Sequence, residues 1–390
     1  MKNNNKHRIG ALFLIIILCM GTLTAAGCGE SETSEDSVTV GDEKISIGMC
    51  FDSFVIERWE KDRDVFVSTA RELGAEVNVQ NANGEISKQI DEIEYFIDKG
   101  VDAIVIISID ADSLTDVVKK AKNKGIKIIA YDRMINNADV DLYISFDNEM
   151  VGMLMAQALA DEIASPEALN TLKTAEISRD TEDENVDKEE ESEEAGIQDE
   201  DVKVCGRVLM LQGSPTDNNV EQVKTGFTSV AEAYGIEIAD SMYCDGWRAE
   251  DASDYLYANP EILDEVDAIM CGNDNLATAV VRVLSEKRKA GEILVVGQDA
   301  DLEACQRIVE GTQVMTVYKP VEKLAEAAAE ATVNLVKGLQ SDTGDTIYDG
   351  TYDIPCIVLD PIAVTRSNID EVIIASGFHL KEEVYMNVIK

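Results

Sequence analysis

The chain has 390 residues, of which 76 are acidic and 34 are basic, giving a formal net charge of −42 at pH 7. This charge opposes binding to nucleic acid or to an anionic membrane surface, so we expect neither as a partner. The length is sufficient for two domains, each with a substantial hydrophobic core.

The first residues have the pattern of a secretory signal peptide. Three basic residues precede the apolar run 11–23, and small residues lead directly to Cys28. We predict a signal peptide over residues 1–27 and lipidation of Cys28, which would hold the chain to the outer face of the cell membrane. An ordinary signal peptide followed by a chance cysteine is the alternative. The polar, acidic stretch 28–44 is predicted to be a tether.

From residue 44 onward, apolar strand-like runs alternate with amphipathic helical runs. The predicted strands cover residues 44–51, 75–82, 101–109, 126–133, 141–148, 204–214, 236–244, 266–274, 293–299 and 313–320. The predicted helices cover residues 57–73, 85–100, 113–125, 149–164, 218–235, 250–263, 276–291, 302–311 and 321–338. Such alternation is typical of parallel sheets covered by helices on both faces. Because one set of elements precedes residue 150 and another follows it, the sequence predicts an α/β protein with two doubly wound parallel-sheet lobes.

One segment interrupts this alternation. Residues 164–203 are strongly acidic and nearly without aromatic side chains. Such a composition cannot bury enough apolar surface to offset its ordering entropy, so we predict a disordered surface insertion. A calcium site is the functional alternative, but the segment lacks the spacing of an EF-hand loop, with its central glycine and final glutamate.

Cysteine and histidine residues give no indication of catalytic or metal chemistry. Apart from Cys19 and Cys28, the cysteines are widely spaced and most lie in apolar runs, so we predict small buried hydrophobic residues, with disulfides as the alternative. No CxxC motif or Cys/His cluster suggests a metal site. His379 is the one histidine after the predicted signal peptide, and we assign it a surface or packing role. We therefore expect no cofactor, no metal ion and no enzymatic activity.

Polar side chains gather where the predicted strands end. They are Arg58 and Trp59, Asp132 and Arg133, Asp217 to Asn219, Asp245 and Trp247, Asn273 and Asp274, Gln298 and Asp299, and Lys319. In doubly wound sheets, ligands bind beyond the carboxyl ends of the strands. A single Asp or Asn in such a place can be a helix N-cap, and we predict that role for Asp217 and Asp301. The repetition, which includes both tryptophans of the chain, favours one shared binding site.

The residue types at these strand ends are suited to sugar recognition. Each hydroxyl of a sugar both donates and accepts hydrogen bonds, and carboxylates, amides and guanidinium groups can each bond two hydroxyls. The apolar C–H faces of a sugar pack against flat aromatic rings. The chain shows no nucleophile with its base, no phosphate-binding glycine loop and no dinucleotide-binding motif.

Six segments carry a resemblance to a known family. They are ERWEKDRDVF, AYDRMINNADVDLYISFDN, GSPTDNN, DGW, GQDAD and GTQVMTVYKP. On these segments the chain resembles the periplasmic binding protein type I family, and within it the D-xylose-binding proteins of ABC sugar transporters. The resemblance spans most of residues 45–378 apart from the acidic insertion, which departs from the family pattern.

The resemblance implies a sugar site between two lobes. The residues that match the family's sugar-binding positions are Arg58, Trp59, Asp132, Arg133, Asn218, Trp247, Asn273, Asp299 and Lys319. It also implies three crossings between the lobes, which we place near residues 148, 321 and 356. The N-terminal lobe would comprise residues 45–148 and 322–356, and the C-terminal lobe residues 149–321 and 357–390.

The family further implies a monomeric binding protein that closes on D-xylose, or on a closely related aldose, and delivers it to an ABC permease. A lipoprotein that senses xylose and signals to a membrane histidine kinase is the main alternative, because its pocket would be the same. A pentose-converting enzyme is disfavoured by the absence of catalytic motifs. A DNA-binding repressor is disfavoured by the charge and by the absence of a helix-turn-helix before residue 45.

Overall fold

A computed structural model describes residues 44–163, 206–339 and 343–388. The predicted signal peptide, Cys28, all but the last residue of the tether, and the whole predicted acidic insertion 164–203 lie outside the described residues. The segment from Lys44 onward forms one compact unit. None of the described helices is both long and apolar enough to cross a membrane.

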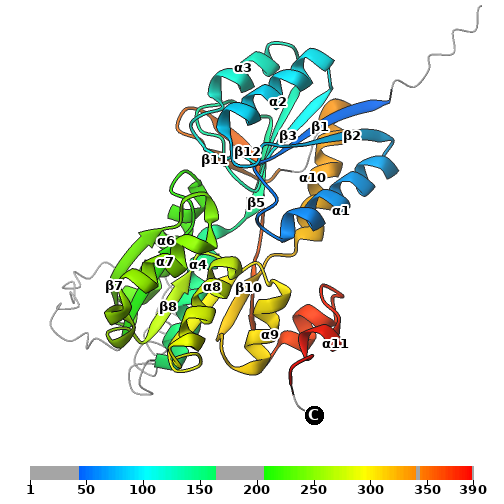
Figure 1. The fold of residues 1–390 in the computed structure, drawn as a ribbon. Helices are drawn as coiled ribbons and strands as arrows, with labels where there is room; N and C mark the ends of the chain where they lie inside the picture. The colour runs from blue at the N-terminus through cyan, green and yellow to red at the C-terminus, as the bar shows by residue number, and fades with distance from the viewer. Residues whose placement is uncertain (1–43, 164–205, 340–342, 389–390) are drawn as a thin grey trace, which may run out of the picture. The chain divides into compact units, whose positions relative to one another are not determined.

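The described strands form two sheets. The first has the order β11-β12-β5-β4-β3-β1-β2 and the second the order β13-β10-β9-β8-β6-β7. The strands of the first are β1 (Ile45–Phe51), β2 (Ala75–Asn81), β3 (Ala103–Ile106), β4 (Lys127–Tyr131), β5 (Leu142–Phe146), β11 (Asp345–Tyr348) and β12 (Asp353–Leu359). Those of the second are β6 (Gly206–Gln212), β7 (Ile236–Tyr243), β8 (Ala268–Cys271), β9 (Leu294–Gln298), β10 (Met315–Tyr318) and β13 (Ile362–Thr365). Each sheet is the centre of one lobe, as predicted (Figure 1).

Helices surround both sheets. The N-terminal lobe contains α1 (Arg58–Glu72), α2 (Ile86–Lys99), α3 (Thr115–Lys122) and α10 (Val321–Val336). The C-terminal lobe contains α4 (Asn148–Ile163), α6 (Asn218–Ala233), α7 (Ala249–Ala258), α8 (Asp274–Glu286), α9 (Leu302–Glu310) and α11 (Lys381–Val384), with the short turns η1 (Asp245–Trp247), η2 (Pro260–Asp264) and η3 (Asp370–Ile374). The helix predicted over 250–263 is interrupted because Pro260 lacks a backbone donor and disfavours the helical conformation of the residue before it.

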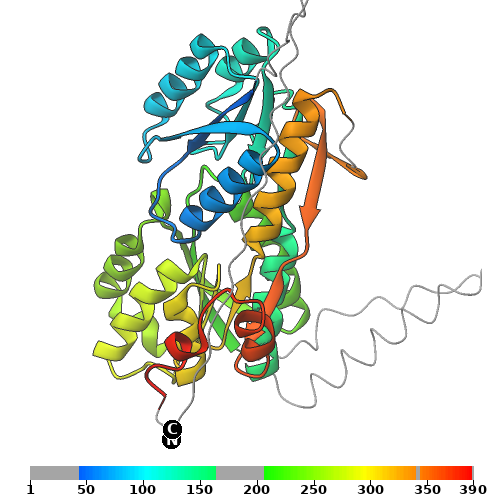
Figure 2. The same ribbon diagram turned by 90° about the vertical axis from the view of Figure 1, so that its right-hand side faces the viewer.

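Late segments of the chain return to both lobes. The chain leaves the first sheet after β5 and enters the second lobe at α4, and it returns after β10 to α10, which lies beside α1 (Figure 2). We predicted the third crossing near residue 356. In the structure it lies a few residues later in the chain. Cys356 lies inside β12, is buried and pairs with Tyr143, so the crossing falls between Leu359 and Ile362. Pro361, which cannot donate to a strand ladder, lies in this gap.

The sheets are mixed rather than wholly parallel. β11 pairs with β12, and β13 with β10, in antiparallel fashion, whereas every other pairing of named strands is parallel. These edge strands lie after the last long helix, where the sequence lacks the strand–helix alternation that predicted the others. Strands in the middle of each sheet, such as β3, are buried along their whole length, as expected for a sheet covered on both faces.

Small residues and cysteines contribute to the packing of the lobes. An added Cβ at Gly152 of α4 would lie 1.9 Å from the Val223 carbonyl oxygen of α6, and one at Gly226 would lie 1.9 Å from the Glu149 oxygen, so glycine allows these helices to touch. The cysteines of the described residues are all buried and unpaired, which confirms that they are small core residues there. Cys205 lies outside the described residues.

Candidate functional site

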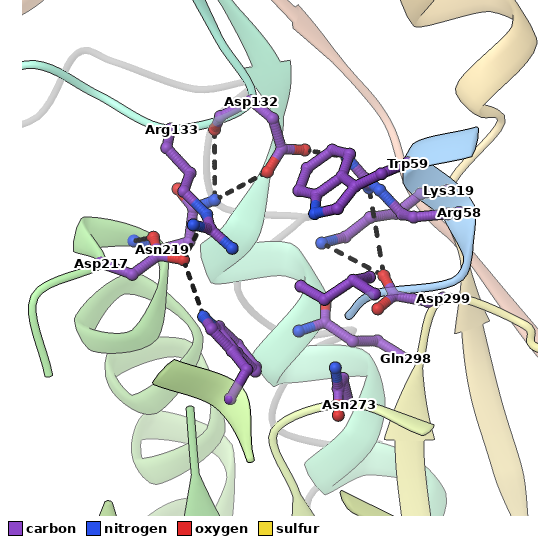
Figure 3. A pocket seen from close by; sticks show the side chains of 12 residues that line it. Arg58, Trp59, Asp132, Arg133, Asp217, Asn219, Asn273, Gln298, Asp299 and Lys319 are labelled. Atoms are coloured by element: carbon purple, nitrogen blue, oxygen red, sulfur yellow. Dashed lines mark hydrogen bonds and ion pairs between the residues drawn. The ribbon is translucent and has the colours of Figure 1, made fainter. Parts of the chain in front are cut away.

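The carboxyl ends of strands from both sheets surround one cavity. Its lining residues are Ile56, Arg58, Trp59, Asp132, Arg133, Asp217, Asn219, Trp247, Asn273, Gln298, Asp299 and Lys319 (Figure 3). About 300 Å³ of space between them is free of protein atoms, part of it open to solvent. Every predicted site residue except Asn218 lines this cavity. The structure therefore brings together side chains that are up to 261 positions apart in the sequence, from Arg58 to Lys319.

Two charged residues form the centre of the N-terminal wall. Arg58, at the start of α1, pairs with Asp132, which follows β4, and its guanidinium lies 4.3 Å from the centre of the Trp59 ring. Burial opposes ionisation of Asp132, but Arg58, Lys319 and Arg133 outweigh it and lower the pKa of the Asp132 carboxyl. Asp132 is thus an ionised acceptor at the cavity wall.

A buried carboxylate lies behind this pair. Asp62, one helical turn after Arg58, has its Oδ2 3.7 Å from Arg58 Nε and accepts a hydrogen bond from the Tyr131 hydroxyl. Burial raises the pKa of Asp62 to about 7, although Arg58 opposes this shift. Asp62 and Asp132 therefore hold the guanidinium of Arg58 from two sides.

Arg133 links the two walls. Its Nη1 donates to Asp52 Oδ2 at 2.9 Å and to the Ser108 carbonyl at 3.1 Å within the N-terminal lobe. Its Nε lies 2.8 Å from Asp217 Oδ2 on the C-terminal lobe. Burial raises the pKa values of Asp52 and Asp217, and Arg133 limits both shifts. Both carboxylates thus meet the same guanidinium from opposite lobes.

Helix N-termini position much of the C-terminal wall. Asp217 caps α6 by accepting from the Asn219 backbone N–H at 3.0 Å, which confirms the predicted cap, but it also accepts from Trp247 Nε1 at 3.2 Å and lines the cavity. Asn273 caps α8, with Oδ1 accepting from Leu276 N–H at 3.0 Å, so its Nδ2 is left for a ligand. Asp301 lies at the N-cap position of α9 but makes no capping side-chain hydrogen bond. The predicted position is right, and the predicted capping bond is wrong.

Three site residues adopt backbone conformations that are uncommon for residues with a side chain. Asp132, Trp247 and Asp299 have φ values of 63°, 60° and 97°. In an extended strand, neighbouring side chains point to opposite faces. The left-handed conformation breaks this alternation, so Asp132 with Arg133, and Gln298 with Asp299, can line the same cavity. Strain of this kind is often concentrated at functional sites.

The remaining wall residues complete a mixed polar and aromatic surface. Lys319 Nζ and Arg58 Nη1 lie 3.8 and 4.0 Å from Asp299 Oδ1. Burial lowers the pKa of Lys319, although Asp299 and Asp132 oppose this. The Trp247 ring lies so close to Gly213 that an added Cβ there would be 2.2 Å away from it.

Several buried polar atoms of the wall make no hydrogen bond to the described residues. They include Nε and Nη1 of Arg58, Nε1 of Trp59, Oδ1 of Asn219 and Oε1 of Gln298. Buried polar groups are usually hydrogen-bonded, so a wall that offers both donors and acceptors is suited to a ligand with several hydroxyls. In the described residues, no group of three or more His, Cys, Asp or Glu side chains is arranged to hold a metal ion.

Sequence reasoning missed or misplaced a few lining residues. Asn218 was predicted to bind sugar, but its Nδ2 donates to Asn136 Oδ1 at 3.0 Å and its neighbour Asn219 lines the cavity instead. The DNN motif indicates the helix start, but it does not determine which side chain of the first turn faces the cavity. Gln298 was seen at a strand end but was not chosen, because only the conformation of Asp299 brings both side chains to the same side. His379 is half-buried, with Nε2 2.7 Å from the Ala300 carbonyl oxygen, in line with its predicted packing role.

Comparisons with known proteins agree with this geometry. Residues 47–340 match the family model described as periplasmic binding protein domain. The D-xylose-binding periplasmic protein of Haemophilus influenzae is 39% identical over 349 residues, covering 87% of this chain and 92% of that protein. The D-xylose-binding periplasmic protein of Escherichia coli is 38% identical over 350 residues, covering 88% of this chain and 93% of that protein. Both relatives are binding proteins by name, in agreement with the prediction that the chain is not an enzyme.

A solved structure shares the fold. The ABC transporter solute-binding protein of Clostridium phytofermentans, solved with bound β-D-glucose, has a TM-score of 0.70 and 24% identity, covering 87% of this chain and 99% of that chain. The match to the family model and to the two relatives over most of the chain confirms the resemblance seen in the sequence segments. The chain belongs to the periplasmic binding protein family.

Proposed function

We propose that the chain captures D-xylose, or a closely related aldose, and delivers it to an ABC permease. The observation that carries this proposal is the cavity itself: charged and amide side chains and both tryptophans face it from two lobes, with donors and acceptors left unpaired. The two relatives of 38–39% identity, which are D-xylose-binding proteins, support xylose over other sugars.

The mechanism that we propose is closure of the two lobes on the sugar. Arg58, Asp132 and Arg133 belong to one lobe, whereas Asn219 and Asn273 belong to the other, so a sugar bound to one wall offers free hydroxyls to the second. A ligand that shifts a protein from mostly open to mostly closed must favour the closed form by about 5 kcal/mol. Hydrogen bonds to charged groups contribute about 1.5–3 kcal/mol each, so a few bonds made only on closure are sufficient.

The charges of the site suit a neutral ligand because each basic side chain already has at least one carboxylate partner. Arg58 is paired with Asp132, Arg133 with Asp52 and Asp217, and Lys319 lies near Asp299. Each pair keeps its side chains oriented while leaving lone pairs or N–H groups for hydroxyls. A ligand with its own charge would disturb this balance in a buried setting, where an unpaired charge is costly.

We place the protein outside the cytoplasmic membrane, attached through a lipid on Cys28 and acting as a monomer. The relatives are periplasmic by name, and the sequence before residue 29 has the pattern of a signal peptide followed by a lipid-accepting cysteine. A lipid anchor of two chains is sufficient for stable attachment. The strongly negative chain would otherwise stay away from an anionic surface.

Isothermal titration of the soluble chain from residue 29 with D-xylose, D-glucose, D-ribose and L-arabinose tests the proposal. We expect one-to-one binding with D-xylose the tightest of the four. Absence of binding to all four sugars would contradict the proposed function, and tighter binding of another aldose would retain the mechanism but correct the ligand.

A further inference from the structure

A second set of contacts joins the lobes at the edge of the site, outside the cavity. Thr216 Oγ1 donates to the Ile109 carbonyl at 3.0 Å, and the Ala111 N–H donates to the Thr216 carbonyl at 3.1 Å. Asn218 Nδ2 donates to Asn136 Oδ1 at 3.0 Å. Ile109, Ala111 and Asn136 follow strands of the N-terminal lobe, whereas Thr216 lies between β6 and α6 of the other lobe and Asn218 is the first residue of α6. None of these residues lines the cavity.

Asn136 and Thr216 are each oriented by contacts within their own lobe. Asn136 donates its backbone N–H to the Ala111 carbonyl at 2.8 Å and its Nδ2 to the Asp112 carboxylate at 2.9 Å. Because a carboxylate can only accept, the Asn136 amide must present its oxygen to Asn218. On the other lobe, Thr216 Oγ1 lies 3.2 Å from Ser214 Oγ. Bonds within each lobe therefore help to orient Asn136 and Thr216 for the contacts between the lobes.

We propose that Ile109, Ala111, Asn136, Thr216 and Asn218 form an interlobe latch that sets sugar affinity by stabilising the closed form, without touching the sugar. Every latch bond joins one lobe to the other, so it exists only when the lobes are closed. The same groups bond water when the lobes are apart, and Thr216 is exposed even in the closed form. Each bond therefore contributes only a little to the free energy of closing. The proposal rests on the proposed function, since it concerns the affinity of the same site.

The latch has a signature that a sugar-contacting residue does not have. The observed affinity is the affinity for the open form multiplied by the ligand-dependent closing equilibrium. Loss of a latch bond reduces the closing equilibrium by one factor whichever sugar is bound. Affinities for all sugars should therefore fall together, and the ratios between them should be preserved.

The test uses Asn218→Ala and Thr216→Val, each titrated with the same four sugars. Loss of one hydrogen bond predicts a rise in Kd of about 2- to 10-fold, equal for each sugar within error. The unfolding temperature of the sugar-free protein should not change, because the latch is open there. Thr225→Val is the matched control: Thr225 is exposed on α6, and among the described residues its hydroxyl bonds only to the Glu221 carbonyl of that helix.

Two titration results would overturn the latch. Unchanged Kd values in both variants would show that the contacts do not stabilise the closed form. A loss of affinity in Asn218→Ala that differs between sugars would instead make Asn218 a sugar ligand, as its sequence motif suggested. A wild-type chain that binds none of the sugars would contradict the proposed function and not the latch.

A second measurement tests the latch without reference to any sugar. In the double variant Asn136→Cys/Asn218→Cys, a short bis-maleimide reagent should join the two thiols, because the replaced side chains are in contact when the lobes close and the reagent spans the distance that a direct disulfide cannot. A cross-linked species is expected for this pair and not for either single variant. Absence of the cross-link with and without D-xylose would contradict the latch.

Discussion

The two walls of the cavity are built by different means. On the N-terminal wall, Arg58 and Asp132 hold each other as ions, and Asp62 supports Arg58 from behind. On the C-terminal wall, helix caps position Asp217 and Asn273, and backbone turns orient the other side chains that line the cavity. The first wall therefore depends on charge pairing, and the second on local backbone structure.

Both walls nevertheless place a buried carboxylate behind the site. On the C-terminal side it is Asp274, which accepts from Thr316 Oγ1 at 2.6 Å, Gln313 Nε2 at 2.8 Å and Asp301 N–H at 3.2 Å. Thr316 Oγ1 also accepts from the Ala300 N–H at 3.1 Å. These bonds hold the turn that follows Asp299, in which φ is positive at two successive residues. Asp274 thus stabilises a strained backbone turn in the C-terminal lobe, whereas Asp62 stabilises the Arg58 guanidinium in the N-terminal lobe.

Removing the charge pair should have the largest effect. Asp132→Ala removes an ionised acceptor from the cavity and leaves Arg58 with only Asp62 and the more distant Asp299. Loss of two hydrogen bonds from a charged group predicts a rise in the Kd for D-xylose of about 100-fold or more. Titration calorimetry measures this, and circular dichroism should show a folded protein. Wild-type affinity in this variant would exclude Asp132 from the binding site.

A change in the backbone of the C-terminal wall should have the next largest effect. In Gly213→Ala, the new Cβ would lie 2.2 Å from the Trp247 ring and must displace it. Since an aromatic stacking contact contributes about 1 kcal/mol or more, the Kd should rise by about 5-fold or more. Trp247 fluorescence should change in the same variant even without sugar. An unchanged spectrum and affinity would mean that the ring does not rest on Gly213.

The capping role of Asn273 and its proposed role in sugar binding can be separated by two substitutions. Asn273→Asp keeps the oxygen that caps α8 but replaces the amide donor, so binding should weaken by about 10-fold at nearly unchanged thermal stability. Asn273→Ala should weaken binding similarly and also reduce the stability by about 1 kcal/mol. Thermal unfolding of both variants distinguishes the roles. Equal stability losses would contradict the capping assignment.

The buried carboxylates predict a smaller effect of pH on stability. Burial raises the pKa values of Asp62 and Asp274 to about 7 in the folded protein, above the ordinary value of 3.8. Between these values the folded state retains protons that the unfolded state releases, so stability should fall as pH rises toward 7. The unfolding temperature of the sugar-free protein should therefore be higher at pH 5 than at pH 8. Asp62→Asn should reduce this difference, whereas an unaffected difference would show that Asp62 does not titrate in this range.

The sequence predicted the strand ends more reliably than the side-chain directions at them. Asp132 and Arg133 could be identified because two charges at the end of an apolar strand are unusual, and the lobes could be identified from the alternation of strands and helices. The sequence did not determine that Asn219 rather than Asn218 lines the cavity, because the two differ only by their rotation about the helix axis. The antiparallel edge strands were not predicted, and the third crossing was placed a few residues too early, because residues 343–365 show no alternation of strands with helices.

Small-angle X-ray scattering of the soluble chain, with and without saturating D-xylose, tests the central claim that the two walls close on one sugar. The account predicts a smaller radius of gyration with D-xylose, and no such change in Asp132→Ala at the same sugar concentration. Xylose binding by calorimetry without any change in the scattering curve would contradict closure.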